Sequence, residues 1–162
     1  MNFRVVVCCL VLTLAGPAIA QTRQLPPVNA LVPNFYYDDV DAAKDWYVDK
    51  LGLRMMIDLG WVAIVEIQPG MQIAVVDGKR GTLDAVEDKG ALLVIETDAL
   101  EEWHAHLSAV EGIEWYQYDD DPRRTRLPNG IMEHAEIHEF RVVDPGGYII
   151  EFFRWKPEFK PR

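Results

Sequence analysis

The chain has 162 residues, of which 26 are acidic and 16 basic, with 49% hydrophobic residues and a net charge of −10. This length and composition are typical of a single globular domain, and they exclude a disordered chain, collagen-like repeats and a small disulfide-rich scaffold. The negative charge argues against nucleic acid as a partner, because phosphate binding requires an excess of Lys and Arg. No stretch reaches the roughly 18–20 apolar residues of a membrane span, so we expect no stable membrane insertion.

The first twenty residues have the pattern of an export signal. A basic residue starts the segment, a short apolar stretch follows, and residues 18–20 (AIA) form a small-x-small cleavage site. Cleavage after this site would remove both cysteines of the chain, Cys8 and Cys9. A cysteine-free mature protein is compatible with an oxidising compartment. We therefore expect an exported protein, periplasmic or secreted, whose mature chain begins with a short extended arm over residues 21–28.

The first half of the mature chain alternates between strand and helix patterns. A β-strand is expected over residues 32–37. A helix capped by Asp39 or Asp41 follows, with apolar residues on one face as far as Leu51, and Gly52 ends it. Three strands are then expected in succession, over residues 53–57, 61–67 and 71–76.

The second half repeats this order. Residues 79–90 are charged and lack periodicity, so we interpret them as a linker between two halves. A strand is expected over residues 91–96, followed by a helix that Asp98 and Glu101 open as a capping box. The last strands are expected over residues 113–118, 133–143 and 148–154, with a polar loop over 119–130 after the first of them.

The order βαβββ thus occurs twice, over about residues 29–78 and 90–155, and local similarities indicate an internal duplication. An Asp-Ala pair precedes a Trp at the same spacing in both helices. Each helix runs into Gly plus a branched aliphatic residue, and each half closes with a strand, a Pro-Gly turn and a strand. We expect a single α+β domain over residues 29–155 and a C-terminal tail over 156–162.

Two segments resemble the vicinal oxygen chelate superfamily, which includes glyoxalase I, bleomycin-resistance proteins, fosfomycin-resistance enzymes and extradiol dioxygenases. Residues 37–53 (YDDVDAAKDWYVDKLGL) are similar to the opening of its module, and residues 143–152 (VDPGGYIIEF) to its DP-x-G-x-x-(I/L)-E ending. The resemblance implies two tandem βαβββ modules that form a U-shaped sheet around a cleft, with the helices outside. It also implies a homodimer, since family members often pair two chains so that sheet edges and clefts are shared.

Active members of the superfamily usually hold a divalent metal with one ligand from the first and one from the last strand of each module. Carried over by position, the final ligand matches Glu151. The other three positions fall on Val32, Ala74 and Ala91, which have no donor atom. One carboxylate does not hold a divalent cation. We therefore expect no metal at the usual positions and no other cofactor.

Arg141 and Glu151 are the candidate catalytic residues. Glu151 points into the cleft if the family register holds, and a lone buried carboxylate must be paired or neutralised. Arg141 lies on the adjacent strand, where fosfomycin-resistance relatives place a substrate-contacting residue, and it shares a face with Glu139. One hypothesis is that an Arg141–Glu151 ion pair replaces the missing metal. The alternative is a structural salt bridge that binds no ligand.

Aromatic residues are concentrated in the segments that would line the cleft. They are Trp61, Trp115, Tyr116, Tyr118, Phe153 and Trp155, with Tyr36 on the first strand. Aromatic walls with few polar groups suit a flat or apolar small molecule, although strands favour aromatic residues in any case. The candidate ligand-binding residues are Tyr36, Glu139, Trp115 and Phe153.

His134, Glu136 and His138 form an alternative metal site. On one strand, His-x-Glu-x-His presents three donors on one face, and imidazole with carboxylate suits zinc or iron; Mn and Ni are further candidates. Alternation counted from Arg141, however, places all three on the opposite face, toward the helices or solvent. A β-bulge would reverse this, and otherwise the segment is a polar, exposed strand face.

Two functions from different classes follow. The favoured one is an exported, metal-free protein of the glyoxalase/bleomycin-resistance kind that binds a small aromatic or apolar molecule in its cleft. The alternative is a divalent-metal-dependent lyase, isomerase or dioxygenase of the same superfamily with a rearranged ligand set. The missing ligand positions favour the first, and the His and Glu residues near the last hairpin keep the second open. A third hypothesis is that the cleft serves only as an interaction module.

Overall fold

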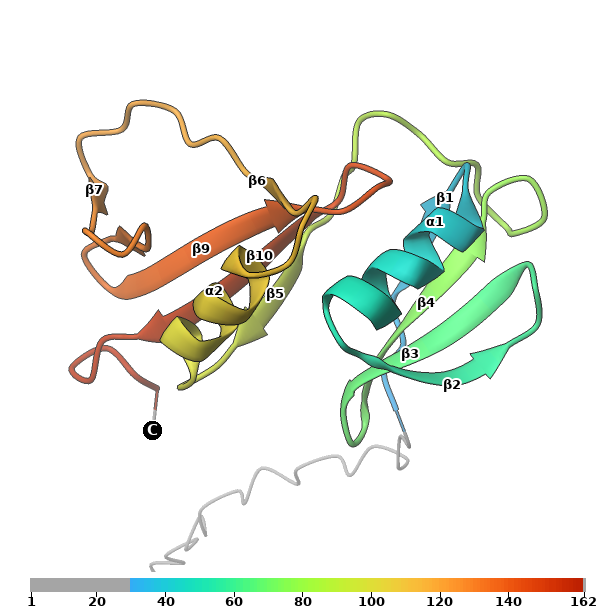
Figure 1. The fold of residues 1–162 in the computed structure, drawn as a ribbon, viewed down its shortest axis with the longest axis horizontal. Helices are drawn as coiled ribbons and strands as arrows, with labels where there is room; N and C mark the ends of the chain where they lie inside the picture. Colours follow the sequence, from blue (N-terminus) through green and yellow to red (C-terminus); the bar gives the residue numbers. More distant parts are fainter. Residues whose placement is uncertain (1–29, 162) are drawn as a thin grey trace, which may run out of the picture.

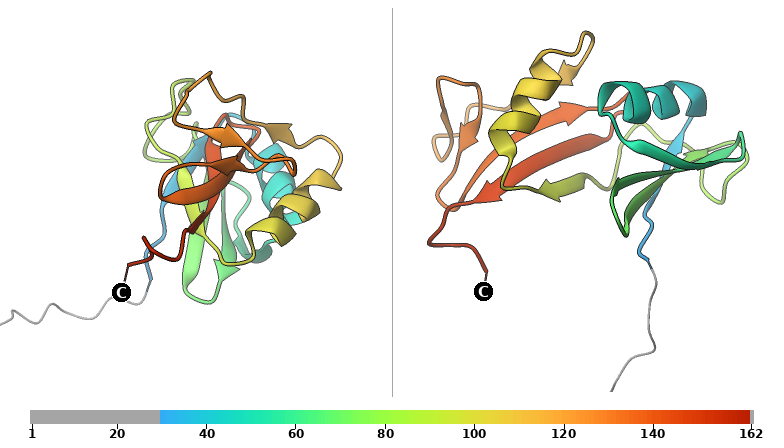
Figure 2. Two further views of the ribbon diagram at one scale, coloured as in Figure 1. Left: turned by 90° about the vertical axis from the view of Figure 1, so that its left-hand side faces the viewer. Right: turned by 60° about the horizontal axis from the view of Figure 1, so that its bottom comes forward.

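The structure is a computed structural model and describes residues 30–161. The predicted export signal over residues 1–20 and the predicted arm over 21–28 lie outside the described residues. Two modules lie side by side, and in each of them a helical segment covers one β-sheet on the same side of the molecule (Figure 1 and Figure 2). None of the helices within residues 30–161 has the length and apolar character needed to cross a membrane.

The N-terminal module has one strand, a helical segment and three more strands. Its sheet has the order β1-β4-β3-β2, in which β1 is parallel to β4 and the other neighbours are antiparallel. The elements are β1 (Asn34–Tyr37), α1 (Val40–Asp45), the π-helix η1 (Trp46–Lys50), β2 (Arg54–Asp58), β3 (Val62–Gln68) and β4 (Met71–Asp77). Every element that the sequence predicts in this half is present.

The C-terminal module forms a separate sheet with the order β5-β10-β9-β8-β7, and β6 also pairs with β9. The parallel pair here is β5 with β10, as β1 is with β4 in the other module. The elements are β5 (Leu93–Glu96), α2 (Leu100–Ser108), β6 (Glu114–Trp115), β7 (Thr125–Arg126), β8 (Met132–Glu133), β9 (Ile137–Val143) and β10 (Ile149–Trp155).

β6 and β8 occupy one strand position, which a long insertion divides. Trp115 of β6 pairs with Val142 of β9, and the Tyr116 N–H donates to the Arg141 carbonyl at 3.1 Å. Met132 of β8 then pairs with Glu139 of β9. Residues 117–131, the insertion, therefore leave β9 and return beside it at nearly the same point, and within the insertion β7 pairs with β8 at the edge of the sheet. With this insertion set aside, both modules have the order βαβββ, so the predicted α+β fold with two tandem modules is confirmed.

Two strands differ from their predicted extent. The strand expected over 113–118 is reduced to β6, because the chain leaves the sheet at the insertion. The strand expected over 133–143 is interrupted by a turn, in which the His134 N–H donates to the Ile137 carbonyl at 2.9 Å. Since β8 and β9 form a hairpin around this turn, alternation counted back from Arg141 does not apply to His134.

The two helical segments begin differently. Of the two predicted candidates, Asp39 and Asp41, it is Asp39 that caps α1, because its side chain accepts a backbone N–H of the first turn at 3.0 Å. The residue before α2 is Ala99, which makes no side-chain cap, so the predicted capping box of Asp98 and Glu101 is wrong. Both carboxylates instead form ion pairs with basic residues of β10 and the C-terminal tail.

Alternation along the strands gives each sheet a face covered by helix and an open face. Phe152 lies with its ring centroid 5.0 Å from Trp103 of α2, and Phe140 lies 5.1 Å from His104 of the same helix. The residues next to Phe140 and Phe152 in sequence point to the open face. They are Glu139, Arg141, Glu151 and Phe153.

Candidate functional site

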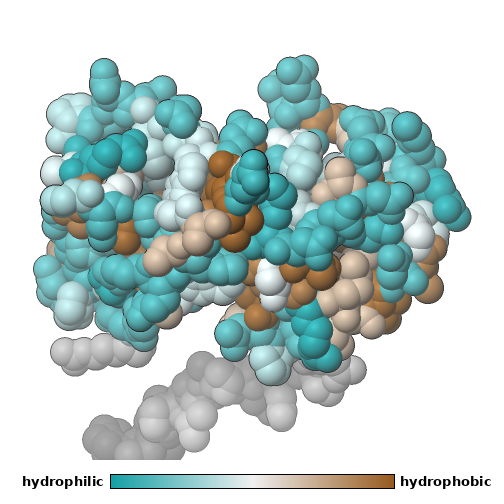
Figure 3. All heavy atoms as spheres, in the orientation of Figure 1, coloured by the Kyte–Doolittle hydropathy of each residue, from teal (hydrophilic) through white to brown (hydrophobic). Residues whose placement is uncertain are grey.

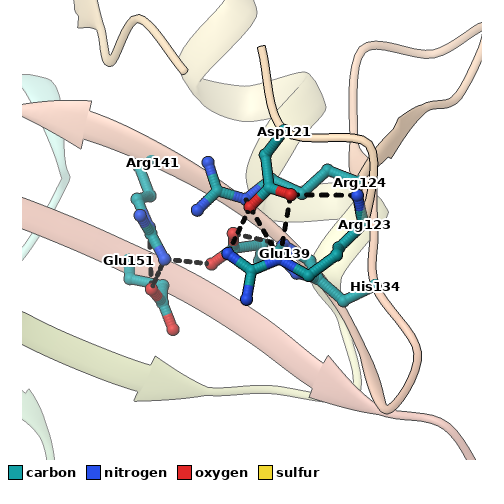
Figure 4. Close-up of polar contacts among 7 residues, drawn as sticks. All are labelled: Asp121, Arg123, Arg124, His134, Glu139, Arg141 and Glu151. Atoms are coloured by element: carbon teal, nitrogen blue, oxygen red, sulfur yellow. Dashed lines mark hydrogen bonds and ion pairs between the residues drawn. The ribbon is translucent and has the colours of Figure 1, made fainter. Parts of the chain in front are cut away.

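A cluster of four titratable side chains lies on the open face of the C-terminal sheet (Figure 4). The Arg141 Nε donates to Glu151 Oε2 at 2.7 Å, and its Nη2 donates to Glu139 Oε2 at 2.9 Å. His134 Nε2 lies 2.6 Å from Glu139 Oε1. We call His134, Glu139, Arg141 and Glu151 the open-face cluster. The predicted Arg141–Glu151 ion pair is thereby confirmed as a contact.

The strand register explains why these residues meet. Arg141 of β9 and Glu151 of β10 are direct partners in the antiparallel ladder, and such cross-strand pairs bring side chains together. Glu139 precedes Arg141 by two positions and therefore shares its face. His134 approaches Glu139 from the turn between β8 and β9.

The cluster is shielded from water, and this shifts its ionisation. Glu139 is 0% exposed and Glu151 is 8% exposed. Burial, and then the neighbouring Glu139 carboxylate, raise the pKa of Glu151 to about 7. Burial also lowers the pKa of His134, with the charges of Arg124 and Arg141 acting in the same direction. The lowered pKa favours the neutral form of the His134 ring, and the tautomer with its proton on Nε2 donates to Glu139.

Tyr116, just before the insertion, and residues at the start of the insertion cover the cluster. The Arg141 guanidinium carbon lies 5.7 Å from the ring centroid of Tyr116 and 5.4 Å from that of Tyr118. Arg124 lies 5.5 Å from the Tyr118 ring and pairs with Asp121. The Arg124 Nε lies 3.7 Å from Asp121 Oδ2, beyond hydrogen-bond distance, and the Tyr118 hydroxyl is buried without a hydrogen-bond partner within residues 30–161. Buried polar atoms normally have a partner, so the Tyr118 hydroxyl is free to bond to water or to another polar group.

Three of the six predicted site residues meet in the open-face cluster, namely Glu139, Arg141 and Glu151. Phe153 follows on the same face of β10, but its ring packs edge-on against Trp155 at 5.4 Å. Phe153 therefore extends the apolar surface beside the cluster.

Tyr36 and Trp115 lie elsewhere. Tyr36 belongs to β1 in the other sheet, where its backbone N–H donates to the Tyr148 hydroxyl at 3.1 Å. Trp115 lies on the helix-covered side of the C-terminal sheet, with its ring 4.9 Å from His104 and 5.8 Å from Phe140. The reason is the register, since Trp115 pairs with a residue of β9 whose side chain is buried in the core.

The residues do not fit the metal centre that the resemblance implies. Two of the positions to which the resemblance assigns metal ligands, Val32 and Ala91, lie before the strands β1 and β5. The register instead pairs Ala74 with Asn34 and Glu151 with Val94. Only Glu151 offers a carboxylate, and the Arg141 guanidinium already binds it. Residues 30–161 contain no group of three or more His, Cys, Asp or Glu side chains placed to hold a metal ion.

The alternative metal site is not assembled either. His134 contacts Glu139, whereas His138 Nε2 lies 3.6 Å from Glu133 Oε1. Glu136 is exposed. The turn between β8 and β9 separates these side chains, so within the described residues His134, Glu136 and His138 point to different surroundings.

Sequence reasoning missed the contribution of the insertion. Asp121 and Arg124 lie in a segment whose polar composition predicts only a solvated loop, and no local signal places it over the sheet. Tyr116 and Tyr118 belong to the aromatic residues noted above, but only the path of the chain brings their rings over Arg141. His134 was assigned to the wrong face because the turn before β9 was not predicted.

No protein-family model matches the sequence, and no curated protein does. Solved structures with similar architecture do match. A glyoxalase/bleomycin resistance protein/dioxygenase from Nocardioides is 19% identical with a TM-score of 0.60, covering 87% of this chain and 91% of its own. A protein of the same description from Alicyclobacillus acidocaldarius is 17% identical with a TM-score of 0.59, covering 85% and 100%.

A lactoylglutathione lyase from Agrobacterium tumefaciens is 23% identical with a TM-score of 0.55, covering 80% of this chain and 95% of its own. At such identities the similarity establishes the fold alone. The chain has the fold of the glyoxalase, bleomycin-resistance and dioxygenase proteins, which confirms the resemblance drawn from residues 37–53 and 143–152.

Proposed function

We propose that the protein binds a small organic molecule over the open-face cluster and does so without a metal ion. The observation that carries this proposal is that Glu139 and Glu151 share Arg141 on a sheet face that has no helix, beneath the rings of Tyr116 and Tyr118. Charged groups withdrawn from water are costly unless they are paired, and they recur at functional sites. Aromatic rings beside such groups suit a flat or apolar molecule that carries a hydrogen-bonding group.

Arg141 supports the metal-free part of the proposal. Its guanidinium supplies the positive charge that the buried carboxylates require, at the place where Glu151 would otherwise bind a cation. Glu151, with its pKa raised to about 7 by burial and by Glu139, can accept a proton from a bound molecule or donate one to it. The metal-dependent alternative would require donors that do not converge within residues 30–161.

The test uses the chain from residue 21 to 162, purified without a chelator and without a His tag. Metal content is measured first, and a panel of aromatic acids, alkylamines and neutral aromatics is then titrated by calorimetry. We expect no bound metal and at least one ligand, whose binding Glu151→Gln weakens by about tenfold, as expected for a charge-assisted hydrogen bond.

The matched control is Glu96→Gln, which changes an exposed carboxylate of the neighbouring strand β5. One zinc, iron, manganese or nickel ion per chain, lost on changing His134 or His138, would overturn the metal-free proposal. If Glu151→Gln and Glu96→Gln bind every ligand of the panel equally, the cluster is a structural ion network and the proposed site is wrong.

We also propose that the chain is exported and that the mature protein forms a homodimer. Several large apolar side chains of the N-terminal module are exposed, among them Leu31, Ile57 and Met71, and Figure 3 shows apolar surface between the modules and over part of the N-terminal one. Such surface favours association of a second copy. Cell fractionation with N-terminal sequencing tests export, and light scattering of the purified chain tests the dimer. An uncleaved cytosolic chain or a monomer would contradict the respective proposal.

A further inference from the structure

A cavity of about 290 Å³ lies at the edge of β9, between the end of β6 and the start of β8. It results from the insertion, because the chain leaves the sheet after Tyr116 and returns at Met132. Phe140 and Arg141 of β9, one from each face of the sheet, both line it. We call this space the edge cavity.

Five rings line the edge cavity, namely His104, Trp115, Tyr116, Tyr118 and Phe140. They form two groups: His104, Trp115 and Phe140 contact one another, with the His104 and Trp115 centroids 4.9 Å apart, and the centroids of Tyr116 and Tyr118 are 5.2 Å apart at an interplanar angle of 89°. Rings arranged in this way accept a planar molecule through stacking and edge contacts. The volume is at the low end for ligand sites and suits a molecule of one or two rings.

The charged residues that line the edge cavity are both arginines. Arg141 already binds two carboxylates, whereas Arg126 is exposed, forms no ion pair within residues 30–161, and donates from Nη1 to the Gly130 carbonyl at 3.4 Å. Among the described residues, no Asp or Glu lines the cavity, in a chain whose net charge is −10. A guanidinium without a carboxylate partner beside aromatic rings recognises a planar anion through paired hydrogen bonds.

We propose that the edge cavity binds a small aromatic carboxylate, with its ring against Trp115 and Tyr116 and its carboxylate on Arg126. This inference rests on the proposed function and names the ligand class and the place where it binds. A ligand seated there also contacts Arg141. Its binding therefore changes the surroundings of Glu139 and Glu151, the two carboxylates that Arg141 binds.

Nuclear magnetic resonance of the chain 21–162 tests this proposal, with benzoate and 2-naphthoate as probes and benzamide as the neutral isostere. We expect both acids to shift the indole resonance of Trp115, which Trp115→Phe identifies. Arg126→Gln should weaken benzoate binding by about tenfold while leaving benzamide binding unchanged. The control is Arg80→Gln, which makes the same charge change at an exposed site beside Trp61 of the other module.

Arg126 is exposed, so its variant is expected to fold even if Trp115→Phe does not. The proposal is overturned if benzoate leaves Trp115 unmoved, if benzamide binds as tightly as benzoate, or if Arg126→Gln and Arg80→Gln weaken benzoate equally. An amine or neutral aromatic that binds the open-face cluster while benzoate fails would overturn only this inference. Failure of the whole panel at both places would overturn the proposed function as well.

Discussion

The Tyr37 hydroxyl of β1 donates to Asp144 Oδ2 at 2.5 Å, and this bond joins the two modules. Asp144 is 3% exposed and also accepts a hydrogen bond from the Tyr47 hydroxyl at 3.0 Å, while its Oδ1 accepts the Tyr148 N–H at 2.8 Å. The Tyr148 ring in turn stacks on Phe35 of β1 at 4.4 Å. The Asp-Pro-Gly-Gly turn therefore fixes the C-terminal sheet, and with it the open-face cluster, relative to the N-terminal module.

Removing the Tyr37 hydroxyl should destabilise the protein by about 1–3 kcal/mol, because a buried carboxylate then lacks one donor. The variant is Tyr37→Phe, and the free energy of unfolding is measured in urea. Tyr36→Phe is the matched control, since Tyr36 is the next residue and its hydroxyl makes no hydrogen bond within residues 30–161. Equal stability of the two variants would mean that the Asp144 contact contributes nothing.

The same tyrosines predict a loss of stability at alkaline pH. Burial, and then the charges of the neighbouring groups, raise the pKa of Tyr37 and of Tyr47 above the usual value. A group with a raised pKa in the folded state contributes stability that is complete below its unfolded pKa, here about 10, and is lost as the pH rises beyond it. The free energy of unfolding of the wild type, measured at intervals between pH 8 and 12, should fall steeply. A parallel fall in the double variant Tyr37→Phe/Tyr47→Phe would contradict this cause.

Gly146 permits the close contact between the turn and Tyr37. A Cβ at Gly146 would lie 2.5 Å from Tyr37 Cδ1 and Cε1, a separation that real side chains do not show. Gly146→Ala should therefore displace the Tyr37 ring and cost about 1–3 kcal/mol of stability, as overpacking does. Gly90→Ala is the control, because a Cβ there meets no atom within 4 Å. A thermal unfolding midpoint that is equal in both variants would show that the turn adjusts freely.

Glu151 predicts a pH dependence of stability near neutrality. Its raised pKa in the folded state means that its contribution is complete below about pH 4 and is lost as the pH rises through about 7. We expect the wild type to lose about 3 kcal/mol over this range through Glu151, because each unit of difference between the folded and unfolded pKa is worth roughly 1.4 kcal/mol. Glu151→Gln should abolish that part of the slope, whereas Glu96→Gln should preserve it. The measurement is the urea midpoint at intervals of half a pH unit.

The sequence predicted those parts of the site that depend on a single strand or on one hairpin. Alternation on β9 and β10 is a local property, so the sequence places Glu139, Arg141 and Glu151 on one face, and the structure confirms their contact. The same counting failed for His134 because a turn intervenes. Trp115 was expected in the cleft because aromatic residues are concentrated in the segments around it, but β6 pairs with β9 in a register that turns this ring toward the helix.

By itself, the sequence determined the βαβββ order of each module, a helix start at Asp39 or Asp41 and the Arg141–Glu151 pair, since these depend on neighbours in the chain or on one hairpin. The tertiary structure decided the role of Asp144, the position of the insertion over Arg141 and the edge cavity. These features join residues far apart in the sequence, such as Tyr37 and Asp144, and no periodicity specifies them. They exist only once both sheets have packed and the chain has closed the loops between them.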